Sequence, residues 1–455
     1  MNIISQENKL NNPIIECCAG FFKRFKMSAI LRKCGLTKKS GVIVNIVFLF
    51  LLGQVFEGKK FNTLNKHYTD KMPFGKDVVY RFIEQSNVNW EQIVFQAANA
   101  VIPEINKLTS EERKTALVFD DTTQYRNRSK KVEMLARCFD HAEHKYYKGH
   151  SILAMIWTDG QATVPVDYRV LSASDDKNLL EGSAFAEDNR TIATKRRKDA
   201  RTGKPTLVLD MLRNVKGSQA DARYVLFDSW FSHPVTVLSI CEMGYDVVAR
   251  LKNNTTKYSC NGESLTLREI FNKNRKRRGM SKYLLSVDIE VVHKEHESVP
   301  AKVVFVRNKQ KRNEWIALIS TDMSLNEEEI IALYGKRWDI EVFFKVCKSV
   351  LKLGKEFQCR SFDSTCALVA VGFVRYMKLA IENRENRDER SLGELFVWCC
   401  KELEDISFSH VFELMLEMFT KFMQDFMCLS KCAVDTAVEQ FMAGIPSSIK
   451  GRLVF

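Results

Sequence analysis

The chain has 455 residues, of which 45% are hydrophobic and 27% charged, a composition that excludes an intrinsically disordered chain and indicates roughly two to four folded domains. Lys and Arg number 69 against 56 Asp and Glu, and the resulting net charge of +13 favours a polyanionic partner such as nucleic acid. The 13 cysteines include no CxxC pair, which argues against a zinc site and predicts reduced, mostly buried thiols.

Residues 1–110 are expected to be helical, because apolar clusters recur at helical spacing between basic segments. The apolar run at residues 42–52 is short compared with the ~20 residues that cross a bilayer, so we expect a buried helix there and no membrane partner. The polar N-terminus has no signal peptide, which predicts a cytoplasmic protein. The region fits either a DNA-binding module or a helical cap on the core, and its charge favours DNA binding.

Residues 111–252 alternate between strand and helix patterns. A β-type run ends at Asp120, and two further strands follow at 149–157 and 162–171. The later elements are a helix near 206–212, a strand at 224–228, a helix at 235–243 and a strand at 246–252. Three strands, helix, strand, helix, strand is the order of an RNase H-like α/β fold with a mixed sheet.

Two of these strands end in acidic residues. Asp120 and Asp121 close the first run, and Asp228 closes the run that begins at Arg223. An acid just past the last apolar residue of a buried strand lies at the carboxyl edge of the sheet, where α/β folds gather their sites. The alternative for each acid alone is a loop or helix-capping residue.

A β-rich insertion is expected at residues 253–325, since three runs there alternate with period two. Ser324 and Glu327 then have the spacing of a capping box, which predicts a helix start before the segment 326–360 that completes the core. Residues 361–455 are expected to form a helical region rich in Phe and Met, which fits a dimer surface and a plain core equally well.

The segment from Tyr334 to Lys348 carries an unusual charge pattern. Tyr334, Arg337, Glu341 and Lys348 are separated by 3, 4 and 7 residues, so on one helix they form a narrow stripe. The opposite arc carries the apolar residues Ile340, Val342, Phe343 and Val346. A single glutamate among cations suits a metal-binding carboxylate next to phosphates. The alternative is a surface helix in which Glu341 pairs with Lys345.

These motifs together resemble bacterial insertion-sequence transposases with a DDE triad, in the subgroup marked by Y-x2-R-x3-E-x6-K, over residues 110 to 360. The resemblance implies that Asp120, Asp228 and Glu341 are catalytic and hold Mg²⁺, for which Mn²⁺ can substitute. It also implies that Tyr334, Arg337, Lys345 and Lys348 bind DNA. Both Asp120 and Asp121 fit the first-acid motif; Asp120 ends the hydrophobic run and is favoured, with Asp121 as the alternative.

The resemblance further implies a cut-and-paste transposase. Such an enzyme binds the terminal inverted repeats of double-stranded element ends, cleaves with two metal ions and joins the 3′-OH ends to target DNA. We expect a homodimer in the synaptic complex, and a bacterial cytoplasmic location, at the nucleoid when bound to DNA. Two alternatives are a transposase-derived DNA-binding protein that has lost catalysis, which the intact triad argues against, and an RNase H-like nuclease that cuts without joining.

Other residues near these motifs carry weaker signals. Three basic runs, at 126–131, 195–204 and 273–278, are expected to contact the DNA backbone. Trp230 follows Asp228 closely; it is either a base-stacking residue or, as we favour from sequence, a core tryptophan.

Overall fold

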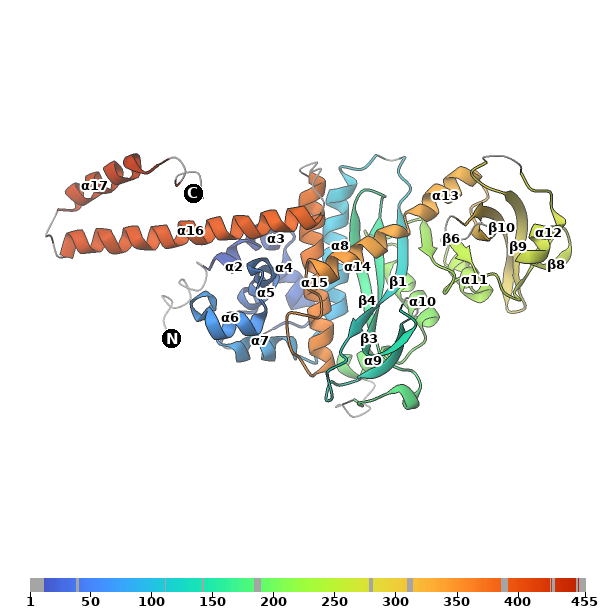
Figure 1. Cartoon of the computed structure of the whole chain (residues 1–455), viewed down its shortest axis with the longest axis horizontal. Helices are drawn as coiled ribbons and strands as arrows, with labels where there is room; N and C mark the ends of the chain where they lie inside the picture. Colours follow the sequence, from blue (N-terminus) through green and yellow to red (C-terminus); the bar gives the residue numbers. More distant parts are fainter. Residues whose placement is uncertain are drawn as a thin grey trace.

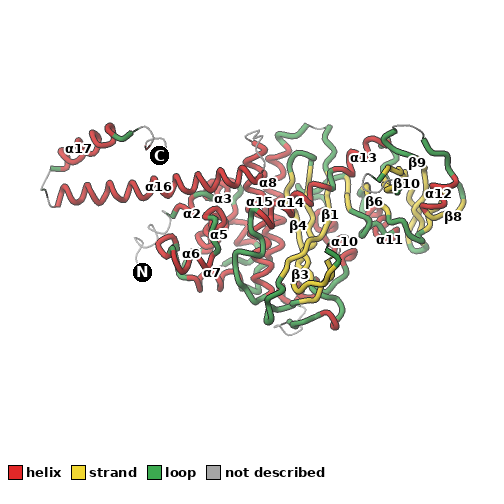
Figure 2. Tube along the Cα trace, viewed as in Figure 1, coloured by secondary structure: helices red, strands yellow, loops and turns green. Residues whose placement is uncertain are grey.

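The computed structural model describes residues 12–37, 41–110, 112–140, 143–183, 190–277, 281–308, 314–385, 392–425, 427, 430–446 and 449. The molecule is elongated, with helices at one end, a sheet in the middle and the β-rich insertion at the other end (Figure 1). Figure 2 shows the strands in two groups, one in the centre and one in the insertion, while the opposite end is wholly helical.

The N-terminal region is built from helices, as its apolar spacing predicts. They are α2 (Pro13–Glu16), α3 (Ala19–Arg24), α4 (Met27–Lys33), α5 (Val44–Gly53), η1 (Gln54–Glu57), α6 (Phe61–His67), η2 (Thr69–Lys71), α7 (Lys76–Ile83) and α8 (Trp90–Asn106). The apolar run at 42–52 becomes the buried helix α5. Helix α8 packs against β4 (Thr163–Leu171) and α15 (Phe362–Glu385), so this region caps the core.

The central strands are β1 (Ala116–Tyr125), β2 (Ala136–Asp140), β3 (Lys145–Thr158), β4, β5 (Tyr224–Phe227) and β6 (Asp246–Leu251). β3 lies antiparallel between β1 and β4, whereas β5 runs parallel to β1 and β6 runs parallel to β5. This arrangement is the mixed sheet of an RNase H-like fold, and the predicted fold class is confirmed. The short β2, which pairs with β3, was not predicted from sequence.

The insertion continues the same sheet. β11 (Trp315–Ser320) pairs antiparallel with β6, and β10 (His296–Arg307) and β9 (Leu285–His293) follow outward. The hairpin of β7 (Lys257–Cys260) and β8 (Glu263–Thr266) and helix α12 (Leu267–Lys273) complete it. Within the described residues all these strands belong to one eleven-stranded sheet, so the insertion extends the core sheet at its β6 edge.

Helices cover both faces of the central strands. On one face, α8, α15 and α14 (Trp338–Ser349) contact β4 or β1. The connections between β4 and β6 contain η3 (Asp176–Asn178), α9 (Ile192–Asp199), α10 (Lys204–Val215) and α11 (Pro234–Glu242). Helix α13 (Glu327–Gly335) begins at a capping box formed by Asn326 and Glu329, so the box predicted at Ser324 and Glu327 is wrong by two residues.

The predicted DNA contact of the basic run 195–204 is wrong for its central arginines. Arg196 and Arg197 are only 5% exposed and turn inward. Both pair with Asp363 at the start of α15; Arg197 also pairs with Glu133, and Arg196 with Glu91 of α8. Burial of a guanidinium is tolerated only where carboxylates and carbonyls accept its hydrogens. This network therefore ties α9 to the helical layer.

Helix α15 is long and apolar enough to span a bilayer by length and composition alone. Its apolar window is nevertheless completely buried inside the protein, as in the central helix of a folded domain. The C-terminal region thus contributes core packing through α15.

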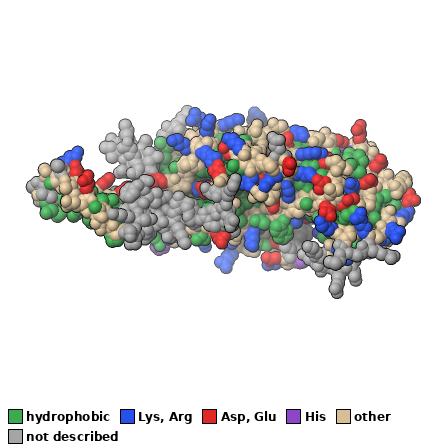
Figure 3. Space-filling view, turned by 90° about the horizontal axis from the view of Figure 1, so that it is seen from above, with side chains coloured by type: hydrophobic (Ala, Val, Ile, Leu, Met, Phe, Trp, Pro, Cys, Tyr) green, Lys and Arg blue, Asp and Glu red, His purple; other side chains and the backbone are tan. Residues whose placement is uncertain are grey.

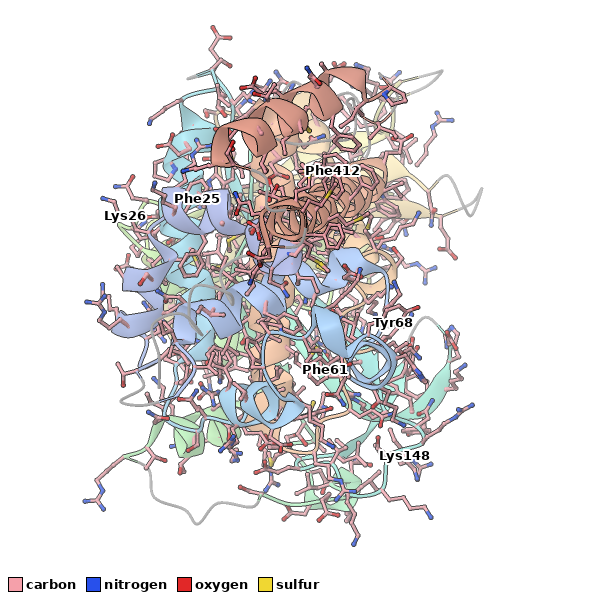
Figure 4. The ribbon with its side chains drawn as sticks, turned by 90° about the vertical axis from the view of Figure 1, so that its left-hand side faces the viewer. Phe25, Lys26, Phe61, Tyr68, Lys148 and Phe412 are labelled. Atoms are coloured by element: carbon pink, nitrogen blue, oxygen red, sulfur yellow. The ribbon has the colours of Figure 1, made fainter. Side chains whose placement is uncertain are left out.

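The remaining C-terminal helices project away from the rest of the protein. α16 (Leu392–Asp425) touches α2 and η1 near its start and then extends away, and α17 (Lys431–Gly444) packs against its far part (Figure 1). Seen end-on, α16 with Phe412 lies beside Phe25, which follows α3, and above the N-terminal helix α6 that begins at Phe61 (Figure 4). Met415, Met418 and Phe419 on α16 are at least half exposed.

Substitution of the shared carboxylate tests the buried network. Asp363→Ala leaves two buried arginines without their common acceptor, and we expect the free energy of unfolding to fall by about 3–5 kcal/mol. Asp210→Ala is the matched control: it removes an exposed pair with Arg213 and should cost less than about 1 kcal/mol. Urea denaturation of both variants measures the difference; equal, small losses would contradict the role of the network.

Candidate active site

The parallel pairing of β1 with β5 brings two of the predicted acids together. The register matches Ala116 with Tyr224 and Val118 with Leu226. Two residues further along both segments stand Asp120 and Asp228, so they are neighbours at the carboxyl end of β5. Neighbouring strands lie about 4.8 Å apart. The runs that precede both acids are buried on both faces of the sheet, so a slip would carry an aspartate into the buried layer or move an apolar residue out of it.

The structure distinguishes Asp120 from Asp121. Successive residues of a strand point to opposite faces. Asp120 faces α14, where its Oδ2 lies 3.6 Å from Nη1 of Arg337. Asp121 faces the other way: its Oδ1 accepts from Nζ of Lys204 on α10 at 2.7 Å, and its Oδ2 from Oγ of Ser151 at 2.6 Å. Asp121 is therefore already hydrogen-bonded on the face toward α10, and Asp120 shares the face toward α14 with Arg337.

The environment of Asp120 opposes its ionisation. Burial raises the pKa of its carboxyl to about 7, and the charges of Asp121 and Asp228 add to the rise. The backbone N–H of Asp121, which donates to Oδ1 of Asp120 at 2.8 Å, and the charge of Arg337 lower the pKa in part. A carboxyl crowded by other acids is a position where a cation is stabilising.

Glu341 is linked to Asp120 through Arg337. Nη2 of Arg337 donates to Oε1 of Glu341 at 2.5 Å, while Nη1 of the same guanidinium faces Asp120. Arg337 is only 16% exposed and Glu341 is 35% exposed. The i,i+4 partner of Glu341 is thus Arg337; the alternative pairing with Lys345 is not what the structure shows.

The charged stripe does not lie on a single helix, contrary to the sequence expectation. Tyr334 belongs to α13, Lys336 and Arg337 form a turn, and α14 starts at Trp338. Gly335 ends α13, and Lys336 then donates to the carbonyls of Lys114 and Asp159, which holds the turn against the core. Val342 is 42% exposed, so it is not part of the buried arc formed by Ile340, Phe343 and Val346.

The remaining predicted DNA-binding residues have different environments. Burial raises the pKa of Tyr334, whose ring lies 5.8 Å from the guanidinium of Arg337. Nζ of Lys348 lies 3.5 Å from Oγ1 of Thr123 on β1, and burial lowers the pKa of this lysine. Lys345 is exposed on the outer side of α14. Tyr334 and Lys348 therefore border the acids, whereas Lys345 faces solvent.

Trp230 is not a core residue, and the interpretation favoured from sequence is wrong. Its side chain is 55% exposed, and its backbone N–H donates to Oδ1 of Asp228 at 2.8 Å. Sequence reasoning also assigned no role to Trp338, which is 60% exposed next to Arg337. The sequence signal that could have singled out Trp338 is its position between Arg337 and Glu341 of the charged stripe.

The donor set suits a hard divalent cation. Carboxylate oxygens are the ligands that Mg²⁺ prefers. Asp120 and Asp228 supply them side by side, and the guanidinium of Arg337 joins Glu341 to Asp120. Across the part of the chain that the structure describes, no three His, Cys, Asp or Glu side chains are already gathered tightly enough to hold an ion. Glu341 and Arg337 therefore have to rearrange for all three carboxylates to share one.

A search of curated proteins finds no match to the sequence. Among solved structures, the cryo-EM structure of a piggyBac transposase synaptic complex with hairpin DNA is similar over 97% of this chain and 85% of that chain, with 13% identity and a TM-score of 0.44.

A family model described as DDE superfamily endonuclease matches residues 49–288. The match includes Asp120 and Asp228 and ends before Glu341. It covers more than half of the 455 residues. The chain belongs to the DDE superfamily endonucleases.

Proposed function

We propose that the protein is a cut-and-paste DNA transposase that binds terminal inverted repeats, cleaves DNA and joins the 3′-OH ends to target DNA. The observation that supports this most is the β1–β5 register, which sets Asp120 beside Asp228, with Glu341 tied to the pair through Arg337. The bacterial insertion-sequence subgroup is part of the same proposal, since Tyr334, Arg337, Glu341 and Lys348 match its signature.

Asp120, Asp228 and Glu341 are the residues that would hold Mg²⁺, with Mn²⁺ as a substitute. When bound, the metal neutralises phosphate charge and makes an attacking oxygen nucleophilic at neutral pH. Asp120 must first lose the proton that its burial favours. Arg337 is then free to leave Glu341 and grip a phosphate with its two parallel N–H groups, while Lys348 adds a second positive charge beside β1.

Double-stranded DNA, both element ends and target, is the proposed partner. Seen from above, Lys and Arg side chains are spread along the body, interspersed with acidic ones (Figure 3). In the first basic run, the exposed side chains are Arg128, Lys130 and Lys131. In the third run they are Lys273, Arg275 and Arg277, and residue 278 lies outside the described residues. These side chains, unlike Arg196 and Arg197, are available to phosphates.

The proposed homodimer uses the C-terminal helices. Val411, Met415, Met418 and Phe419 on α16 and Phe441 on α17 are at least half exposed. A projecting helix with such a row of large apolar side chains is typical of a surface that a second protein chain covers.

Replacement of the acids on the two faces of the sheet tests the site directly. Asp120→Asn and Asp228→Asn each remove a proposed metal ligand, and we expect the rate of Mg²⁺-dependent cleavage of an element-end duplex to fall at least about a thousandfold. Asp121→Asn is the matched control, because Asp121 faces Lys204 on the opposite side, and it should retain activity within about tenfold. EDTA should abolish cleavage by the unaltered protein, and added Mn²⁺ should restore it.

The assignment fails if Asp121→Asn is the inactive variant and Asp120→Asn cleaves normally. Cleavage that persists in both Asp120→Asn and Asp228→Asn would point to a site elsewhere in the chain.

The pKa of Asp120 predicts how metal binding depends on pH. A carboxyl with a pKa of about 7 is protonated below that value, and the proton must leave before a metal binds. We therefore expect the affinity for Mn²⁺ to rise about tenfold per pH unit up to pH ~7 and to level off above it. Calorimetric titration between pH 5.5 and 8.5 measures the profile. Asp121→Asn removes a charge that raises the pKa of Asp120, so it should move the plateau to lower pH, and a flat profile for the unaltered protein would refute the assignment.

Strand joining separates a transposase from a nuclease of the same fold. Pre-cleaved element ends with free 3′-OH groups, incubated with supercoiled plasmid and Mg²⁺, should yield covalently joined products. Nicked plasmid without any joined ends would support a simple nuclease, and DNA binding without nicking or joining would support a protein that has lost catalysis.

A further inference from the structure

Two pairs of adjacent cysteines meet where helix α16 joins the rest of the protein. Cys17 and Cys18 link α2 to α3, whereas Cys399 and Cys400 lie on α16, far later in the chain. Helix α16 packs against α2 near its start and then projects away (Figure 1). All four side chains are thiols in the structure, and the proposed DNA chemistry uses none of them.

The first pair is packed into the apolar core. Sγ of Cys17 lies 3.8 Å from Sγ of Cys18 and donates to the carbonyl of Ile14 at 3.2 Å. Cys18 is buried, whereas Cys17 is half-buried and within reach of a small solute. A disulfide inside the pair is disfavoured, because adjacent Cα atoms are about 3.8 Å apart and disulfides usually span about 4.4–6.8 Å. Oxidation of the pair to a disulfide therefore needs a third sulfur.

Cys399 supplies that sulfur from α16. It is buried, and its Sγ lies 3.9 Å from Oε2 of Glu382 on α15. The pKa of Cys17 is raised by its contact with Cys18, by burial and also by the charge of Cys399, so the thiols of Cys17 and Cys399 are close enough to interact. Cys400 is turned by about 100° around the helix and is more exposed.

A buried lysine lies beside these thiols. Nζ of Lys378 on α15 pairs with Oε1 of Glu382 at 2.6 Å. Contact with Cys17 and the charge of Lys378 lower the pKa of Cys18, although burial opposes them. The thiolate is the form that attacks an oxidant. Cys366, by contrast, is a core thiol whose pKa burial raises, and it is expected to be inert.

We propose that these thiols form an oxidation site for a hydroperoxide, at which the Cys17–Cys18 pair closes a disulfide with Cys399 and fastens α16 to the N-terminal helices. A thiolate of the pair attacks the O–O bond and becomes a sulfenic acid, and the Cys399 sulfur then displaces its hydroxyl group as water. Two S–H bonds break and one S–S bond forms. The two electrons and two protons pass to the peroxide, so that H₂O₂ leaves as two waters.

A covalent bond at this point has a large effect on α16. Beyond its start the helix extends away from the body, and α17 packs against its far part. With the thiols reduced, packing against α2, η1 and α15 holds the helix; with the disulfide formed, the junction cannot open without breaking a bond. The exposed apolar side chains of α16 are carried on the same helix, so the oxidation state determines how firmly they are held.

The test maps disulfides in the full chain after treatment with H₂O₂, by denaturation, alkylation, tryptic digestion and mass spectrometry. Trypsin releases each cysteine pair in a peptide of its own, residues 10–23 and residues 391–401. We expect these two peptides to be joined, with the loss of two hydrogen masses, and to separate after treatment with dithiothreitol. Cys366 should remain fully alkylated in the same sample.

Cys399→Ala should abolish the joined peptide, whereas the matched control Cys400→Ala, one position along the same helix, should retain it. Both variants keep a small apolar side chain, so the fold is preserved. Peroxide should slow amide hydrogen exchange at the start of α16 at least about tenfold in the unaltered protein, and leave it unchanged in Cys399→Ala.

The inference is overturned if no joined peptide forms, if the disulfide forms within either peptide, or if the joined peptide survives Cys399→Ala. Hydrogen exchange that the disulfide leaves unchanged would show that the bond does not fasten the helix, and would equally overturn it. None of these measurements involves DNA, so their outcome is independent of whether the protein cleaves or joins DNA.

Discussion

The parallel pairing of β1 with β5 is the constraint on which the site depends. It is set by two short, fully buried apolar runs, each followed by an aspartate at the same distance. Because a slip would carry an aspartate into the buried layer or an apolar residue out of it, the two carboxyls are held together despite their repulsion. The raised pKa of Asp120 follows from that enforced burial and proximity. The folding energy of the sheet thus maintains a cluster of negative charge that needs a cation.

In the structure, a positive charge of the chain itself partly neutralises these carboxylates. Arg337 lies between Asp120 and Glu341 as a built-in counter-ion, positioned by a turn that Lys336 anchors to the core. Under the proposed function, the carboxylates would exchange this counter-ion for a divalent metal, and the guanidinium would then be available to a phosphate. Under the proposed function, the same residue would stabilise the acids without DNA and bind the substrate when DNA is present. On the opposite face, Lys204 and Asp121 neutralise each other and take no part in the exchange.

The fold and the order of its acids were predictable from sequence because they depend on local patterns: apolar runs, their lengths and the residues that end them. The side of the sheet that each aspartate faces was not, because Asp120 and Asp121 fit the motif equally and only packing against α14 and α10 separates them. The inward turn of Arg196 and Arg197 depends on Asp363, more than 160 residues away. Likewise, the break after Gly335 and the exposure of Trp230 arise from tertiary contacts that no helical wheel contains.

A crystal structure of the full chain with Mn²⁺ and an element-end DNA, with the ion located by its anomalous scattering, tests the central claim most directly. The account predicts Mn²⁺ bound by carboxylate oxygens of Asp120 and Asp228, with Glu341 released from Arg337 and turned toward the metal. An ion held by Asp121, or three carboxylates that remain apart with Arg337 still joined to Glu341 while DNA and Mn²⁺ are both bound, would contradict it.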